Sequence, residues 1–318
     1  MNKTAKKRLI VIGGATASGK SDVAAILANK VGGEVVSADS IQVYKHFNIG
    51  AGKPSDLTRQ LAPHHMLDFV NPEDEFNIVK FRSYADPIIA EIFARGKIAL
   101  IAGGSGLYIK ALTDRLSGAA KVSSEANEKV EEIVKEKGLA QLYKIACDID
   151  PERTKKIHPN DSFRIKRVVG LYFSSAKKMD ELYNPKVESI YDPIYFILTL
   201  ERSELFERIN ERVDMMLATG FKEEVSKLIK LGYDERIKAM RSLGYRTLFL
   251  EAQGVVAPDK VADIIKKESR AFAKRQMTWF KHIDGKIDIE VQKNDSAQVV
   301  AEKIFEHKKF QHAIQSIY

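Results

Sequence analysis

The segment that most constrains the fold of this chain is residues 14–21, which read GATASGKS. They have the G-x-x-x-x-G-K-S spacing of a phosphate loop. The apolar run 9–12 predicts a buried parallel strand before the loop, and the spacing over 22–31 predicts a helix after it. Loop N–H groups and the helix N-terminus then form a site for an anion, to which Lys20 adds positive charge. The Ser21 hydroxyl can hold Mg²⁺.

A second short strand, around Val35 and Val36, ends at Asp39. In open α/β sheets the carboxyl ends of parallel strands face the ligand crevice. Asp39 is therefore placed to face whatever the phosphate loop holds. An aspartate that follows a strand also commonly caps a helix or a turn. Position alone leaves both interpretations of Asp39 open.

A third apolar run, 98–102, predicts another buried strand, and Gly103-Gly104-Ser105 follows it. This is a second strand–glycine–helix turn, and we expect the Ser105 hydroxyl to face the crevice. His64 and His65 suggest a metal site. No third ligand accompanies them at a suitable spacing, so structural hydrogen bonding is the favoured interpretation.

Composition narrows the class of protein. The chain has 318 residues, of which 44% are hydrophobic, so it can form a proper core. No stretch approaches the ~20 apolar residues of a membrane helix. Cys147 is the only cysteine, which excludes a disulfide framework and favours a cytoplasmic location. The net charge of +8 fits a polyanionic partner such as RNA, although it also fits a merely basic enzyme.

The strand pattern stops near residue 117 and resumes only at 194–198, with charged helical segments between. We therefore predict an α/β fold, a parallel sheet flanked by helices as in P-loop NTPases, with a small all-helical insertion domain. The expected divisions are a first part of the core at 1–116, the insertion at 117–192, and a second part of the core with basic C-terminal helices at 193–318.

The predicted helix 259–282 carries a positive stripe, because no acidic residue interrupts 269–283. Trp279 and Phe280 lie next to the stripe. This combination is typical of nucleic-acid backbone binding, with base stacking on the aromatic rings. Beyond about residue 290 the sequence indicates only a polar helix.

Taken together, the motifs over residues 9–283 resemble the tRNA dimethylallyltransferases, also called tRNA isopentenyltransferases. The motifs that carry the resemblance are, in chain order, 14–21 (GATASGKS), 37–40 (SADS) with 42–44 (QVY), 49–50 (IG) with 53–54 (KP), 63–65 (PHH) with 67–68 (LD), 103–108 (GGSGLY), 158–161 (HPND) with 164–165 (RI), Arg241 with 244–246 (GYR), and 274–276 (KRQ) with 279–280 (WF). The phosphate loop alone would not separate this family from the kinases.

The resemblance implies transfer of a dimethylallyl group from dimethylallyl diphosphate to N6 of the adenosine 3′ of the anticodon, with release of diphosphate. Asp39 matches the family's general base, and Ser105 stands where a hydroxyl bonds the bridging oxygen. Lys20 and Mg²⁺ on Ser21 would stabilise the departing charge. The residues matching the diphosphate site are Gly14, Ala15, Thr16, Ala17, Ser18, Gly19, Lys20, Ser21 and Arg208.

The resemblance also implies that the partner is a tRNA anticodon stem-loop, whose target base must leave its stack. The insertion would clamp the stem. We expect a monomer that does not associate with membranes. The residues matching the family's RNA contacts are Asp39, Ser40, Ile41, Gln42, Phe163, Arg164, Ile165, Lys166, Arg167, Arg241, Ser242, Leu243, Gly244, Tyr245 and Arg246.

Four positions depart from the family pattern. Ala15 replaces a common proline, Gly52 a usual alanine and Ser105 a usual threonine, while Ile41 stands where other members often carry arginine or another side chain. None of these changes removes a reacting group. They bear on the fine detail of RNA contact, not on the class of reaction.

Three other functions compete with this one. A kinase that uses ATP explains the phosphate loop equally well, but neither the basic C-terminal helix nor the later motifs. An isopentenyltransferase acting on free adenine nucleotides would share the core without needing an RNA surface. A non-catalytic RNA-binding module would not need Lys20, Ser21 and Asp39 intact.

Overall fold

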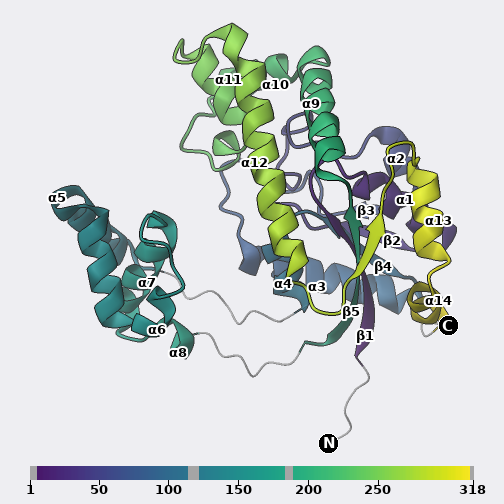
Figure 1. The fold of residues 1–318 in the computed structure, drawn as a ribbon, viewed down its shortest axis with the longest axis horizontal. Helices are drawn as coiled ribbons and strands as arrows, with labels where there is room; N and C mark the ends of the chain where they lie inside the picture. The colour runs from purple at the N-terminus through teal and green to yellow at the C-terminus, as the bar shows by residue number, and fades with distance from the viewer. Residues whose placement is uncertain (1–5, 114–121, 183–188, 316–318) are drawn as a thin grey trace, which may run out of the picture. The chain divides into compact units, whose positions relative to one another are not determined.

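The computed structural model describes residues 6–113, 122–182 and 189–315. It divides into two compact units, a core made of Met1–Asp114 with Ser189–Tyr318 and a second unit, Arg115–Glu188 (Figure 1). The expected boundary between residues 116 and 117 lies outside the described residues. At the other boundary, the strand β5 (Tyr191–Thr199) begins at Tyr191, two residues before the predicted second part of the core.

The core is built on a parallel sheet, as the strand–loop–helix order predicts. Its six described strands have the order β3-β2-β4-β1-β5-β6. Besides β5, they are β1 (Lys7–Gly14), β2 (Glu34–Ser37), β3 (His64–His65), β4 (Ala99–Gly103) and β6 (Ile287–Glu290). The central strand β1 pairs with β4 and β5 on its two sides, for example Val11 with Ile101 and Tyr195.

Helices cover both faces of the sheet, which explains why the central strands read as continuous apolar runs. Alternate residues of β1 enter opposite cores: Leu9 and Val11 one, Ile10 and Ile12 the other. The core helices are α1 (Lys20–Lys30), α2 (Asp56–Leu61), α3 (Ile78–Ala94), α4 (Gly106–Thr113), α9 (Arg202–Ala218), α10 (Phe221–Lys230), α11 (Tyr245–Ala252), α12 (Val261–Lys281), α13 (Ala297–Phe305) and α14 (Lys308–Gln315), with 3-10 turns at Ala239–Arg241 and Pro258–Lys260.

The expectation of only a polar helix beyond about residue 290 is wrong, because the C-terminal segment is part of the core. It supplies β6 to the sheet edge and then packs α13 and α14 on the face that carries α1. Val300, Ile304 and Phe310 are buried there. The ring of Phe310 packs edge-on against Phe196 of β5, with the ring centroids 5.9 Å apart. These residues belong to the core.

The second unit is helical throughout its described part. It contains α5 (Ser124–Ile149), α6 (Pro151–Thr154), α7 (Ser162–Ser175) and α8 (Met179–Leu182). Gly138, with φ of 77°, interrupts α5, and Asp161 caps α7 by accepting a hydrogen bond from the Arg164 N–H at 3.0 Å. The unit has its own apolar core, which includes Val130, Leu142 and Val169.

Candidate active site

A cavity of about 360 Å³ lies at the carboxyl ends of β2 and β4. The phosphate loop lines it with Thr16, Lys20 and Ser21, β2 leads into it through Asp39, and β4 through Ser105. The structure thus brings together five residues that sequence analysis singled out from three separate segments. This is the crevice expected at the carboxyl edge of an open parallel sheet.

The phosphate loop takes its shape from left-handed backbone at two positions. Gly19 has φ of 83° at the N-cap of α1, and Ala17, which pays a steric cost there, has φ of 62°. Lys20 folds back over the loop, where its ammonium donates to the Ala15 carbonyl at 3.1 Å. The Ser18 hydroxyl is buried and has no hydrogen-bond partner among the described residues.

Gln276 on α12 ties the phosphate loop to the second glycine turn. Its Oε1 accepts from the Thr16 N–H at 2.8 Å, and its Nε2 donates to the Gly104 carbonyl at 3.0 Å. A Cβ at Gly104 would come within 2.3 Å of that Nε2, and one at Gly103 within 2.3 Å of the Ala38 carbonyl. The two glycines are therefore required by close approach. Sequence analysis counted Gln276 in a family motif but did not predict this bridge.

Asp39 fulfils both interpretations that its position allowed. Its Oδ1 accepts from the N–H groups of Ile41 at 2.8 Å and Gln42 at 3.2 Å, which makes a turn, and the residue also lines the cavity. Gln42, another predicted RNA contact, also lines the cavity, although most of its surface is buried. Its side chain is buried, accepts from the Ser37 hydroxyl at 2.9 Å and donates to the Gly52 carbonyl at 3.0 Å.

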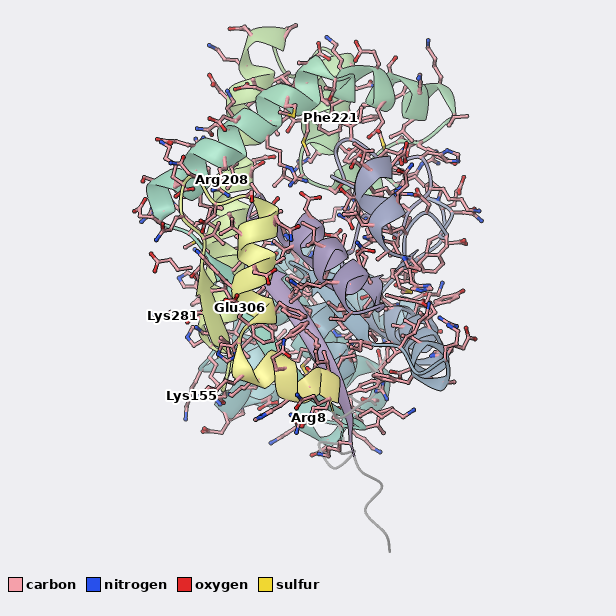
Figure 2. The ribbon with its side chains drawn as sticks, turned by 90° about the vertical axis from the view of Figure 1, so that its right-hand side faces the viewer. Arg8, Lys155, Arg208, Phe221, Lys281 and Glu306 are labelled. Carbon is pink, nitrogen blue, oxygen red and sulfur yellow. The ribbon has the colours of Figure 1, made fainter. Side chains whose placement is uncertain are left out.

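The expected diphosphate contact of Arg208 is also corrected. Its guanidinium donates to Glu204 at 2.6 Å and to the carbonyls of Gln292 and Lys293, both at 3.2 Å, on the segment that follows β6 (Figure 2). Arg208 does not line the cavity. Arg212, one helical turn later on α9, does. Sequence analysis assigned the diphosphate contact to Arg208.

The charges in the cavity are incompletely compensated. Burial, with a contribution from nearby Arg212, lowers the pKa of Lys20 to about 8, while Asp39 acts in the opposite direction. Burial likewise lowers the pKa of Arg212, against the attraction of Asp39 and Asp22. Two cations that are costly to keep charged here would be stabilised by an anionic ligand.

The histidine pair makes hydrogen bonds, as predicted. Nε2 of His65 lies 2.7 Å from Oε2 of Glu34, and Nδ1 of His64 lies 2.8 Å from the Ala62 carbonyl. No group of three or more His, Cys, Asp and Glu side chains in the described ranges could hold a metal ion. The structure adds that His64 lines the cavity, which its sequence context did not indicate.

Most of the other predicted RNA contacts line the cavity or lie at the surface, at least in part. Ser40, Ile41, Ser242 and Leu243 line the cavity. The side chains with a large exposed fraction are Phe163, Arg164, Arg241 and Arg246. Lys166 pairs with Glu131 at 2.7 Å, and Arg167 is half-buried.

Three of the predicted RNA contacts are corrected, because they are buried inside the protein. Ile165 is in the core of the second unit, and Gly244 and Tyr245 are in the main core. The Tyr245 hydroxyl donates to Glu224 at 2.6 Å.

The structure contradicts the expected base stacking on Phe280, whereas Trp279 is half-buried. Phe280 is 2% exposed. Trp279 packs so closely on the backbone of α4 that a Cβ at Gly106 would be 2.1 Å from its ring. The predicted positive stripe on α12 is accessible to a ligand, because the side chains of its basic residues are exposed. These exposed residues are Lys267, Lys274, Arg275 and Lys281. In the part of the chain that the structure describes, no helix is long and apolar enough to cross a membrane.

The chain matches the family model "IPP transferase" over residues 42–283, and "Isopentenyl transferase" over residues 7–64. Two tRNA dimethylallyltransferases are similar over nearly the whole chain. The protein from Alkaliphilus oremlandii is 36% identical, covering 96% of this chain and 98% of its own length. The protein from Geobacter sulfurreducens is 37% identical, covering 94% and 97%.

Solved structures agree with these matches. The tRNA isopentenylpyrophosphate transferase of Bacillus halodurans superposes with a TM-score of 0.72 at 30% identity, over 98% of both chains. A eukaryotic dimethylallyltransferase acting on tRNA gives a TM-score of 0.75 at 26% identity, over 97% of this chain and 78% of that one. These matches over most of its length show that the chain belongs to the IPP transferase family.

Proposed function

We propose that this chain transfers a dimethylallyl group from dimethylallyl diphosphate to N6 of the adenosine 3′ of the anticodon in tRNA. The observation that carries the proposal is a single cavity in which an anion-binding loop faces a carboxylate. A bond forms between N6 and C1 of the allyl group, and the bond between C1 and the diphosphate oxygen breaks. The electron pair leaves with diphosphate, and the amine loses a proton.

Departure of the diphosphate needs positive charge and N–H donors fixed in advance. Lys20, the loop backbone and Arg212 supply them in this proposal, with Arg212 in place of Arg208. The Ser21 hydroxyl, which lines the cavity, and the carboxylate of Asp22, the next residue in the chain, are oxygen donors of the kind that Mg²⁺ prefers. Bound Mg²⁺ would add neutralising charge at the diphosphate, so these residues fit the expected cofactor.

The acceptor nitrogen is a weak nucleophile, so a base must take its proton. Asp39 is suited to this role because the Ile41 and Gln42 N–H groups both donate to its Oδ1, which orients the carboxylate rigidly. Ser105 lines the same cavity and carries the hydroxyl assigned to the bridging oxygen. The tight contact of Gly103 on the Ala38 carbonyl fixes the distance between these two strand ends.

For the RNA, we propose that the exposed basic residues of α12 and the exposed Arg241 and Arg246 meet phosphates, and that Ser40 and Leu243 meet the target base in the cavity. Phe163 is 78% exposed beside Arg164 at the start of α7, a combination suited to stacking on an unpaired base. The second unit would clamp the anticodon stem. Relatives that act on tRNA support this assignment.

We further propose that the protein works as a monomer in the cytoplasm. Light scattering of the purified protein tests the monomeric state, since a stable dimer would double the measured mass.

One assay separates the proposed function from its rivals. The protein, Mg²⁺, dimethylallyl diphosphate and unmodified tRNA are incubated together, and the digested RNA is analysed by mass spectrometry. We expect one prenyl group on the adenosine 3′ of the anticodon. Prenylation of AMP but not of tRNA would favour the nucleotide-specific enzyme, and ATP-dependent phosphorylation of a metabolite would favour a kinase. RNA binding without any transfer would favour the non-catalytic module.

A further inference from the structure

We infer that His64 is a positioning residue whose Nε2 accepts a hydrogen bond from a water molecule in the hydration shell of the cation at Ser21. The inference rests on the proposed function, because that function supplies the cation. It concerns a side chain that the motif analysis assigned only to structural hydrogen bonding.

The position of His64 follows from strand pairing. His64 of β3 pairs with Val35 of β2, and side chains two apart on a strand share a face. Val35, Ser37 and His64 accordingly line the cavity together. Val35 also packs into the core beneath α1, the helix whose first turn carries Ser21. The imidazole thus lies on the face of the sheet that is covered by α1, the helix that contains Ser21.

The neighbours of His64 agree with this placement. Asp22, next to Ser21, is close enough for its charge to act on the imidazole, and so is Arg59 of α2. The Asp22 carboxylate in turn accepts from the Thr58 hydroxyl at 2.8 Å. His64 therefore lies near the charged side chains at the start of α1.

The hydrogen bond at Nδ1 fixes which ring nitrogen of His64 is an acceptor. A backbone carbonyl can only accept, so Nδ1 must donate its hydrogen to the Ala62 oxygen. Burial lowers the pKa of His64, which keeps the ring neutral at neutral pH. Nε2 then carries a lone pair. It is buried and has no hydrogen-bond partner among the described residues. Leaving such an acceptor unpaired costs about 1–3 kcal/mol.

The chemistry of the ligands decides which group donates to Nε2. Diphosphate oxygens are acceptors, so they cannot fill this role. Mg²⁺ prefers oxygen to nitrogen ligands and usually keeps several of its waters. A metal-bound water has hydrogens to donate and can lie between the Ser21 site and the imidazole. Groups that hold metal ligands in this indirect way are commonly important for affinity.

His65 provides a matched contrast one residue away. Its Nε2 already bonds Glu34 at 2.7 Å, and the residue does not line the cavity. The histidine at position 65 of β3 therefore has a structural role, whereas the Nε2 of the histidine at position 64 is an acceptor without a donor among the described residues. Substitutions at the two positions can be compared directly.

The test measures binding of inorganic diphosphate to the full chain by calorimetry, without RNA, while the MgCl₂ concentration is varied. In His64→Asn the amide can still donate to the Ala62 carbonyl, but no atom reaches the Nε2 position. In His64→Gln the side-chain oxygen reaches approximately that position. We expect His64→Asn to raise the Mg²⁺ concentration for half-maximal binding about tenfold. His64→Gln should recover most of this loss, and His65→Gln should match the parent.

Binding without Mg²⁺ serves as the internal control, since all four proteins should then bind diphosphate equally weakly. Thermal unfolding confirms that each variant folds, and His64→Leu keeps the test decisive if the Asn variant does not. An unchanged Mg²⁺ requirement in folded His64→Asn, or in His64→Leu if Asn fails to fold, overturns the role of His64 alone. Diphosphate binding by the parent that ignores Mg²⁺ overturns the proposed cation, and this inference with it.

Discussion

The two ends of β2 use charge in opposite ways. At its amino end Glu34, 3% exposed, bonds His65, Arg95 and Lys97 at 2.7 to 2.9 Å. Burial alone would raise the pKa of Glu34, but the three partners outweigh it and lower that pKa to about 2.

Beyond the carboxyl end of the strand, Asp39 shares a cavity with Lys20 and Arg212, and burial dominates the pKa of both cations. A fully paired buried charge stabilises the fold, whereas incompletely paired charges mark where a ligand completes the set. This contrast distinguishes the structural cluster of Glu34 from the candidate active site.

The strongest test of the contrast is Asp39→Asn. The amide oxygen still accepts from the Ile41 and Gln42 N–H groups, so the turn is preserved while the base is lost. We expect the transfer rate in single-turnover assays to fall about 10³-fold. The affinity for tRNA, measured by filter binding, should change little. Turnover near the parent level would show that the carboxylate at the carboxyl end of β2 is as structural as Glu34.

Comparing Arg212→Ala with Arg208→Ala sharpens the boundary of the site. Arg212 lines the cavity, so its loss should lower kcat/KM about 10²-fold. Arg208 bonds Glu204 and the 292–293 carbonyls, so its loss should mainly lower the melting temperature. If Arg208→Ala proves the more damaging to kcat/KM, the family-based assignment of Arg208 to the diphosphate is reinstated.

The Glu34→Gln substitution tests the amino end of β2, where the buried charge has a structural role. We expect the free energy of unfolding at pH 7 to fall by about 1–3 kcal/mol, because charge-assisted bonds to three partners are weakened. The pKa of Glu34 is lowered on folding from 4.5 to about 2. Its contribution is therefore complete above pH 4.5 and declines as the pH falls toward 2.

Denaturant unfolding of the parent and Glu34→Gln at pH 7 and at successively lower pH follows this contribution. The difference in stability between the two proteins should narrow as the pH falls below 4.5. A difference that persists unchanged to pH 2 would contradict the lowered pKa.

The smallest expected effect concerns Lys20. With a pKa of about 8 in the free protein, Lys20 loses its charge as the pH rises, and diphosphate binding must then be accompanied by proton uptake. Affinity should fall about tenfold between pH 7 and pH 9. The Lys20→Arg variant, charged throughout this range, corrects for titration of the ligand itself. Parallel pH profiles for the parent and the Lys20→Arg variant would refute the lowered pKa.

Features that depend on adjacent residues could be predicted from the sequence. The phosphate loop, the strands beside it and the placement of Asp39 and Ser105 each follow from a short motif and the strand that precedes it. The C-terminal elements could not, because Val300 and Phe310 become core residues only by packing on strands far away in the chain.

The assignment of the diphosphate contact to Arg208 and not to Arg212 failed for the same reason. Both lie on α9, and what removes Arg208 from the site is the 292–293 segment, whose position follows from the unpredicted strand β6. The bridge from Gln276 to Thr16 joins residues 260 positions apart, so no local pattern could reveal it.

Because of the Gln276 hydrogen bonds, a chain can contain the complete phosphate-loop motif and still lack a functional site. A chain ending before α12 would retain all eight residues of the phosphate loop yet lack the amide that holds the Thr16 N–H and the Gly104 carbonyl together. During synthesis the loop residues emerge long before the helix that braces them. Competence to handle diphosphate should therefore arise late, when the C-terminal helices dock, and not when the motif itself is complete.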